Sequence, residues 1–151
     1  MYKLLKSKPV IEKNKEALIE KCQKLRSLGV IPSMKVILVG KNPASLIYTR
    51  NKKKFMDQIG ADCEIISLPE NLAAQDFLKK IEQISFDATV HGCFVQLPLP
   101  KQLGHIDVGE LIPPEKDVDG FHPKNLYSLM QGDIGQQSLL PCTPKGIITL
   151  L

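Results

Sequence analysis

Three short apolar runs, separated by stretches with helical periodicity, constrain the fold of this 151-residue chain more than any other feature. The runs are rich in β-branched and aliphatic side chains, each is followed by glycine or proline, and they cover residues 34–39, 63–68 and 89–97. Apolar positions recur at helical spacing in the segments 9–28, 44–59 and 71–84. Strands that alternate with helices in this way predict an α/β fold of three layers, a parallel sheet with helices on both faces.

Local signals predict where the helices begin and end. Ser7 is expected to cap the first helix near Pro9, and Gly29 to end it. The helix over 71–84 is expected to turn five apolar side chains toward the core: Leu72, Phe77, Leu78, Ile81 and Ile84. Beyond residue 98 the pattern predicts a helical turn at 108–112, a helix at 123–130, a polar loop at 131–138 and a final helix with Thr143 as its N-cap and Pro144 at its first position.

Composition excludes several classes of protein. With 43% apolar and 24% charged residues, the chain suits one globular domain. It contains no apolar stretch of signal-peptide or membrane-span length, so we expect a cytoplasmic protein that contacts no membrane. Four cysteines, at positions 22, 63, 93 and 142, lack the paired spacing of zinc ligands, which predicts reduced, mostly buried thiols and no metal. The three histidines show no nucleophile pattern beside them, which argues against a catalytic triad.

The first candidate site follows the first predicted strand. Tyr48 and Lys52 are four residues apart on the helix predicted there, so they share a face and their polar ends can meet. A lysine pressed against an aromatic ring in a partly dry cleft loses solvation and becomes usable as an acid or base. The alternative is a solvated lysine run, 52–54, beside a tyrosine of the core.

Two further segments carry polar groups next to predicted strands. Gln96 ends a buried strand that prolines prevent from continuing, so its amide is either presented to a cleft or satisfies the backbone of the loop. Asp117 and Asp119 lie two residues apart beside Gly120. This pair could bind a cation, could accept hydrogen bonds from an aminopyrimidine edge, or could form an Asx-type turn.

Together these segments resemble one family, the bifunctional methylenetetrahydrofolate dehydrogenase/methenyltetrahydrofolate cyclohydrolases. Four motifs occur in the family's order and at its spacing: VGKNPAS at 39–45 with Tyr48 and Lys52, HGCFVQLPLP at 91–100, KDVDGFHP at 116–123 and PCTPKG at 141–146. The likeness covers about residues 35–151. It implies that this chain, 1–151, is the folate-binding catalytic domain, and that it ends at the start of the helix leading to the NADP-binding Rossmann domain.

The resemblance also implies roles for individual residues. Lys52 would be the catalytic lysine, Gln96 would orient it, Tyr48 would stack on the folate ring system, and Asp119 would accept hydrogen bonds from the amino edge of the pterin. The substrate contacts would come from Tyr48, Ser45, Gln96, Leu97, Pro98 and Asp119. Thr143 would lie at the cleft edge near the cofactor, and no other cofactor contact is expected in this chain.

The implied activity belongs to one-carbon metabolism and supports purine biosynthesis. The parent enzyme would oxidise 5,10-methylenetetrahydrofolate with NADP and hydrolyse the methenyl product to 10-formyltetrahydrofolate. Its folate substrate could be polyglutamylated, and the parent is expected to be a homodimer. The sequence contains no G-x-G-x-x-G motif, so this chain alone is expected to bind folate without dehydrogenase activity.

Two other functions compete with this one. A nucleic-acid-binding α/β module could use Arg50 and the lysines at 52–54, although the net charge of +4 and the absence of tryptophan argue against it. A non-catalytic interaction domain could have inherited the fold. We expect no nucleic-acid partner.

Overall fold

The computed structural model describes residues 5–133 and 139–151, and its elements alternate as predicted. The main elements are α1 (Ser7–Ser27), β1 (Ser33–Val39), α2 (Pro43–Ile59), β2 (Asp62–Leu68), α3 (Ala74–Ser85), β3 (Gly92–Gln96), α4 (Pro123–Met130) and α5 (Cys142–Leu150). Two 3₁₀ turns, Lys101–Leu103 and Val108–Glu110, lie between β3 and α4. Most of the predicted polar loop at 131–138 lies outside the described residues.

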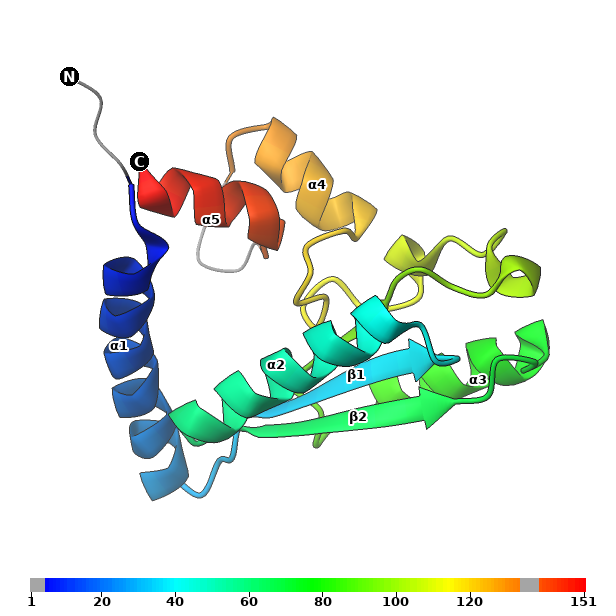
Figure 1. The fold of residues 1–151 in the computed structure, drawn as a ribbon, viewed down its shortest axis with the longest axis horizontal. Coiled ribbons are helices and arrows are strands. Elements are labelled where there is room, and N and C mark those ends of the chain that lie inside the picture. Colours follow the sequence, from blue (N-terminus) through cyan, green and yellow to red (C-terminus); the bar gives the residue numbers. More distant parts are fainter. Residues whose placement is uncertain (1–4, 134–138) are drawn as a thin grey trace.

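The three strands form a parallel sheet in the order β2-β1-β3 (Figure 1). β1 is central, and its Val36 lies opposite Ile65 of β2 and Phe94 of β3. A central parallel strand is covered on both faces, which explains why residues 36–39 are all buried and apolar.

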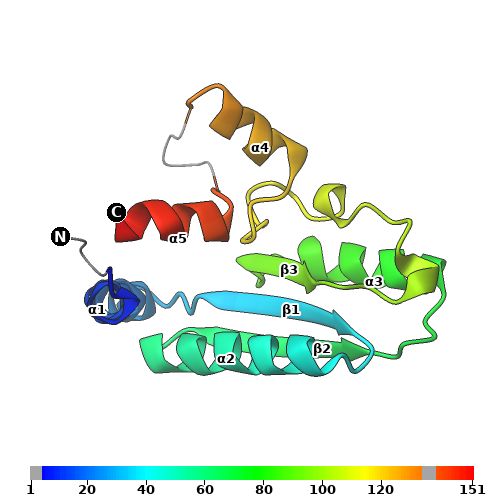
Figure 2. The same ribbon diagram turned by 45° about the horizontal axis from the view of Figure 1, so that its top comes forward.

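Successive side chains of a strand point to opposite faces, and the core is divided accordingly. Ile37 and Val39 of β1 pack with Phe77 and Ile81 of α3. Val36 belongs to a separate cluster on the α2 face with Cys63 and Phe94. Figure 2 shows α2 and α3 on opposite sides of the sheet, which confirms the predicted three layers.

Several predicted boundaries are wrong. β3 begins at Gly92 rather than at residue 89, because the Asp87 carboxylate accepts hydrogen bonds from the backbone N–H and hydroxyl of Thr89 and folds this stretch into a turn. Ser7 and Thr143 are not N-caps, since both lie inside their helices and Lys6 and Pro141 hold the cap positions.

The third helix also differs from the prediction. α3 begins at Ala74 instead of residue 71, and Leu72 packs on the core from the turn before it. Leu78 is 38% exposed, because the buried stripe of α3 runs through Phe77, Ile81 and Ile84 and leaves Leu78 at its border.

α1 is attached at one end of the fold. Among its residues only Cys22 is buried, in a small cluster with Ile59 and Ala61. The Arg26 side chain donates a hydrogen bond to the Gly60 carbonyl, 2.7 Å away. In Figure 1, α1 meets the end of α2 near one of its ends and α5 near the other, and it stands to one side of the sheet.

Within the described residues, none of the helices combines the length and the apolar character needed to cross a membrane.

Candidate active site

A pocket of about 400 Å³ lies between α2, the outer edge of β3 and the loop at 117–120. Its lining includes Lys52 and Tyr48 of α2, Phe94 of β3 and Asp119 of the loop. An isolated parallel bridge between Cys93 and Asp117 brings this loop alongside β3. The site therefore lies beside the sheet edge, with Met34 from the start of β1 in its lining, rather than beyond the carboxyl ends of the strands.

Lys52 lines this pocket between Phe94 and Asp119. Its ammonium nitrogen is 3.6 Å from an oxygen of the Asp119 carboxylate and 3.6 Å from the centroid of the Phe94 ring. A carboxylate and the face of an aromatic ring both attract a cation, so these neighbours fix where the ammonium lies. The side chain of Lys52 is 38% exposed, which leaves it open to a ligand.

Tyr48 lies one helical turn from Lys52 and lines the same pocket, as the four-residue spacing predicted. The residue is 63% exposed, so the alternative of a core tyrosine is wrong. The lysine run also divides: Lys53 pairs with Asp57 at 3.0 Å and Lys54 is exposed, whereas Lys52 alone of the three lines the pocket. A flat, accessible ring beside a cation is suited to stacking on a planar ligand.

The two neighbouring aspartates have different tasks. Asp117 is buried and accepts hydrogen bonds from the backbone N–H groups of Gly120 and His122, three and five residues further on, so it holds the backbone of the loop instead of a ligand. Asp119 faces the pocket. Burial raises the pKa of the Asp119 carboxyl above its ordinary value, Lys52 opposes this rise, and Asp117 adds to it.

Gln96, Ser45 and Leu97 meet at the end of β3, apart from the lining of this pocket. The Gln96 amide nitrogen and the Ser45 hydroxyl both donate to the Leu97 carbonyl, at 2.9 and 3.2 Å. Gln96 makes no hydrogen bond to Lys52; its Oε1 is buried and has no partner among the described residues. An unpaired acceptor of this kind is costly unless a ligand or water donates to it.

Pro98, another predicted substrate contact, lies beyond this point. It lines a separate cavity of about 380 Å³ together with Gly40 and Lys41. The structure thus brings Tyr48, Lys52 and Asp119 together and leaves Ser45, Gln96, Leu97 and Pro98 as a second group at the end of β3.

Sequence reasoning missed most of the other residues that line the pocket, and two of them make contacts that matter for the site. Phe94 supplies the ring that Lys52 contacts, and its place in the alternation of β3 could have indicated that it faces α2. Cys142 lines the pocket from the first residue of α5, and its thiol donates to the Val118 carbonyl at 3.3 Å. Thr143, next to it, is exposed. Three of the four cysteines are buried and all four are free thiols.

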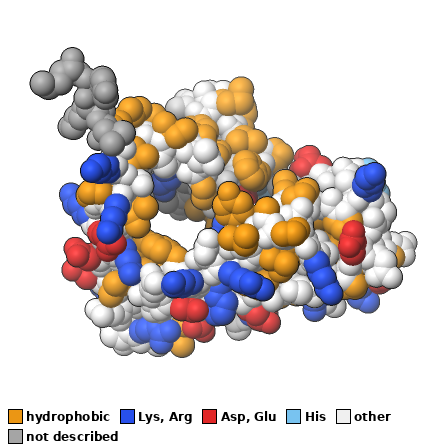
Figure 3. All heavy atoms as spheres, viewed as in Figure 1, with side chains coloured by type: hydrophobic (Ala, Val, Ile, Leu, Met, Phe, Trp, Pro, Cys, Tyr) orange, Lys and Arg blue, Asp and Glu red, His pale blue; other side chains and the backbone are white. Residues whose placement is uncertain are grey.

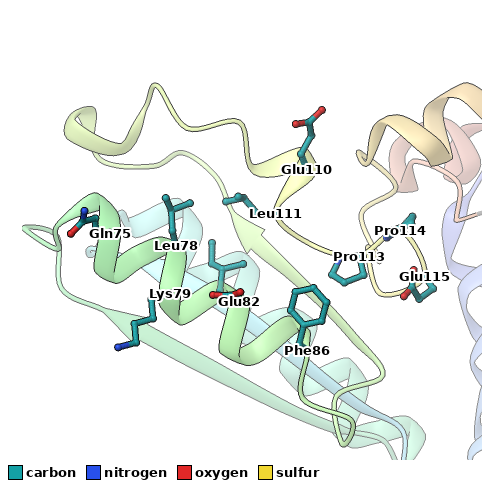
Figure 4. A pocket seen from close by; sticks show the side chains of 11 residues that line it. Gln75, Leu78, Lys79, Glu82, Phe86, Glu110, Leu111, Pro113, Pro114 and Glu115 are labelled. Atoms are coloured by element: carbon teal, nitrogen blue, oxygen red, sulfur yellow. The ribbon is translucent and has the colours of Figure 1, made fainter.

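The described residues include no group of three or more histidine, cysteine, aspartate or glutamate side chains placed to hold a metal ion. Figure 3 shows a hollow on the face that carries α2 and α5, with hydrophobic and basic side chains around it. A second groove, of about 880 Å³, lies along α3. Figure 4 shows Leu78, Phe86 and Pro113 at this groove, which includes none of the predicted site residues.

The sequence of this chain matches a known protein family over most of its length. The pattern described as tetrahydrofolate dehydrogenase/cyclohydrolase, catalytic domain, matches residues 5–119. The chain belongs to this family. The matched range includes Ser45, Tyr48, Lys52, Gln96 and Asp119, whereas Cys142 and Thr143 lie beyond it.

Relatives in the tetrahydrofolate dehydrogenase/cyclohydrolase family are similar throughout the chain. The bifunctional protein FolD of Bacillus mycoides is 43% identical over 148 residues, which are 98% of this chain and 51% of that protein. The crystal structure of the bifunctional enzyme FolD from Campylobacter jejuni superposes with a TM-score of 0.91 at 41% identity, covering 99% of this chain and 52% of that one. This chain therefore spans about half the length of the relatives it matches.

A third member of the family was solved with ligands. The methylenetetrahydrofolate dehydrogenase-cyclohydrolase of Trypanosoma brucei, in complex with NADP cofactor and an inhibitor, superposes with a TM-score of 0.87 at 28% identity. The match covers 99% of this chain and 50% of that protein.

Proposed function

We propose that this chain is the folate-binding catalytic domain of a longer bifunctional enzyme of one-carbon metabolism. The observation that carries the proposal is the grouping of Tyr48, Lys52 and Asp119 from two distant segments around one pocket, in a domain of this family. The parent enzyme would oxidise 5,10-methylenetetrahydrofolate and hydrolyse 5,10-methenyltetrahydrofolate to 10-formyltetrahydrofolate.

Lys52 is the residue proposed to move protons in the hydrolysis. Water adds to the amidinium carbon of the methenyl bridge and loses one proton. The hydroxyl formed in this way loses its own proton as it becomes the formyl C=O, while a ring nitrogen gains a proton as its bond to that carbon breaks, so one proton is released to solvent overall. In its neutral form, the Lys52 amine next to the bridge can accept a proton from the water and return one to the ring nitrogen. Because the substrate is itself cationic, Asp119 provides compensating charge next to Lys52.

The remaining predicted residues would bind and orient the folate. Tyr48 would stack on its ring system, and Asp119 would accept hydrogen bonds from the amino edge of the pterin. Gln96 is proposed to orient Lys52 or the substrate through the buried oxygen that lacks a partner. Ser45, Leu97 and Pro98 would shape the approach to the site from the end of β3.

NADP would accept the hydride in the dehydrogenase reaction of the parent enzyme. The sequence of this chain lacks the glycine-rich dinucleotide motif, so its residues do not fit the pyrophosphate of that cofactor. Thr143 remains the candidate contact at the cleft edge. A cytoplasmic homodimer that acts on polyglutamylated folates and supplies purine biosynthesis completes the proposal for the parent.

The direct test is to mix the chain with 5,10-methenyltetrahydrofolate and follow the loss of its absorbance. The Lys52→Met variant and the uncatalysed reaction are the controls. We expect hydrolysis above background that disappears with Lys52→Met, and binding of tetrahydrofolate that survives the substitution.

Two results would count against parts of the proposal. Hydrolysis that continues unchanged in Lys52→Met would remove Lys52 from its role. A chain that neither hydrolyses the substrate nor binds tetrahydrofolate would show that this domain does not form the site by itself.

A further inference from the structure

A buried network of hydrogen bonds around Asp117 holds the loop that carries Asp119. The Asp117 carboxylate accepts the N–H of Gly120 at 3.0 Å and that of His122 at 2.7 Å. It also accepts a hydrogen bond from the side-chain amide of Asn125 at 3.2 Å. Asp117 and Asn125 are only 5% and 4% exposed, so water competes little for these bonds.

Asn125 connects two parts of the chain. Its amide nitrogen donates to the Pro114 carbonyl at 2.9 Å as well as to Asp117, so it ties the segment before the loop to the carboxylate inside it. All of α4 is described, and Asn125 is its one buried residue. The apolar side chains of this helix are exposed instead: Leu126, Tyr127, Leu129 and Met130. A helix that buries an amide against a carboxylate is suited to holding that carboxylate rather than to filling a core.

The same loop also contacts the segment at 140–142, where α5 begins. Gly120 has φ = 74°, and a Cβ at this position would lie 2.6 Å from the Pro141 nitrogen. The Cys142 thiol donates to the carbonyl of Val118, which directly precedes Asp119. The backbone on both sides of Asp119 is therefore fixed, and its carboxylate is kept 3.6 Å from the Lys52 ammonium.

We propose that Asn125 is a positioning residue, which acts through Asp117 to hold the Asp119 carboxylate in the pocket and so sets the affinity for the reduced pterin. This inference rests on the proposed function, because Asp119 is the group that would recognise the ligand. Asn125 does not line the pocket, so its effect on a ligand must pass through the loop.

The experiment is a double-mutant cycle of Asn125→Ala and Asp119→Asn, with tetrahydrofolate titrated anaerobically into each 151-residue protein by calorimetry. Asn125→Ala should weaken binding about tenfold, because it removes hydrogen bonds to a buried carboxylate. In the Asp119→Asn background the same substitution should change affinity less than about twofold, since the group it positions is already altered. Met130→Ala, an exposed truncation on the same helix, is the matched control and should leave affinity unchanged.

A purely structural role for Asn125 would give a different pattern. Equal losses in both backgrounds, or no loss in either, would overturn the proposal. Amide hydrogen exchange at Gly120 and His122 provides a readout that needs no ligand, and it should be faster in Asn125→Ala while exchange in β1 is unchanged. Unchanged exchange at these two amides would also overturn it. Faster exchange in a chain that binds no tetrahydrofolate would support the positioning of the loop and count against the proposed function alone.

Discussion

The two faces of the sheet are built from the same strands but serve different purposes. On the α3 face, Cys93 and Val95 of β3 join a continuous apolar cluster. On the α2 face, Phe94 lies between them in sequence, packs in a much smaller cluster, and carries the Lys52 ammonium over its ring. One step along β3 thus separates the main core from the candidate active site. A strand edge covered by a loop instead of a second helix leaves room for polar groups.

The largest effect is expected from a substitution in the apolar core on the α3 face of the sheet. Phe77 is fully buried in the main cluster, so Phe77→Ala should lower the free energy of unfolding by about 3–5 kcal/mol through lost burial and a residual cavity. Urea denaturation followed by circular dichroism measures this loss. Phe86→Ala, at the C-cap of the same helix where the residue is 70% exposed, is the control and should change the free energy of unfolding little. A loss below about 1 kcal/mol for Phe77→Ala would mean that the cluster repacks.

Cysteine side chains on the two faces of the sheet should differ in their rate of reaction with a thiol reagent. Burial raises the pKa of Cys93 to about 11 and makes its side chain inaccessible. Burial also raises the pKa of Cys142, but this thiol is exposed at the pocket. In the native protein at pH 8, a chromogenic disulfide reagent should modify Cys142 on the order of a hundredfold faster than Cys93.

Cys142→Ser provides the control for that experiment. The variant should lose the fast phase and keep the slow ones. A fast phase that remains would show that the reagent reaches one of the three buried thiols.

The third prediction concerns recognition at the pocket. Asp119→Asn should weaken tetrahydrofolate binding about tenfold, since a neutral amide is a poorer acceptor for an amino group than a carboxylate. Calorimetry on the chain measures the change, with Asp62→Asn, an exposed aspartate on β2, as the matched control. An unaltered affinity would remove Asp119 from ligand recognition.

The pH dependence of stability tests the environment of the Asp119 carboxyl. Burial raises the pKa of Asp119 in the folded state, so the folded protein binds this proton more tightly than the unfolded chain. The wild type should therefore lose stability, relative to Asp119→Asn, as pH rises from about 3.8 through the raised pKa. Denaturation at several pH values in this window measures the difference. A difference of the opposite sign would mean that the ion pair with Lys52 outweighs burial.

The smallest effect is expected on the outer surface of α2. Lys53 and Asp57 form an exposed pair at i and i+4, so Lys53→Ala should lower the midpoint of thermal unfolding only slightly. Thermal unfolding with and without added salt measures this change, which should shrink in high salt. A decrease as large as that of a core substitution would show that Lys53 has a further role.

The order of elements was predictable because it depends on local patterns. Apolar runs ended by Gly40 and Pro69 indicated strands, and Gly29 indicated a helix end. Boundaries set by hydrogen bonds of single side chains were not predictable in the same way. The Asp87 turn before β3 is an example, since the same residues fit a longer strand equally well.

The site was predictable only where partners are close in sequence. The spacing of Tyr48 and Lys52 on one helix required no tertiary information. The contacts of Lys52 with Phe94 and Asp119 depend on how β3 and the following loop pass α2, across more than 40 residues. The residue pattern indicated Asp117 and Asp119 as a candidate pair, only the resemblance to the family singled out Asp119, and nothing in the sequence indicated Asn125.

The small buried surface of α1 has a consequence for local unfolding of the molecule. Because this helix of 21 residues buries one side chain, its contribution to cooperativity is small compared with that of the sheet. It should detach as a separate unit, with amide protection in α1 lost at a lower free energy than in β1. A protease would then cut in the connection at 28–32 before the sheet unfolds, which leaves Lys52 and Asp119 in place on the remaining body.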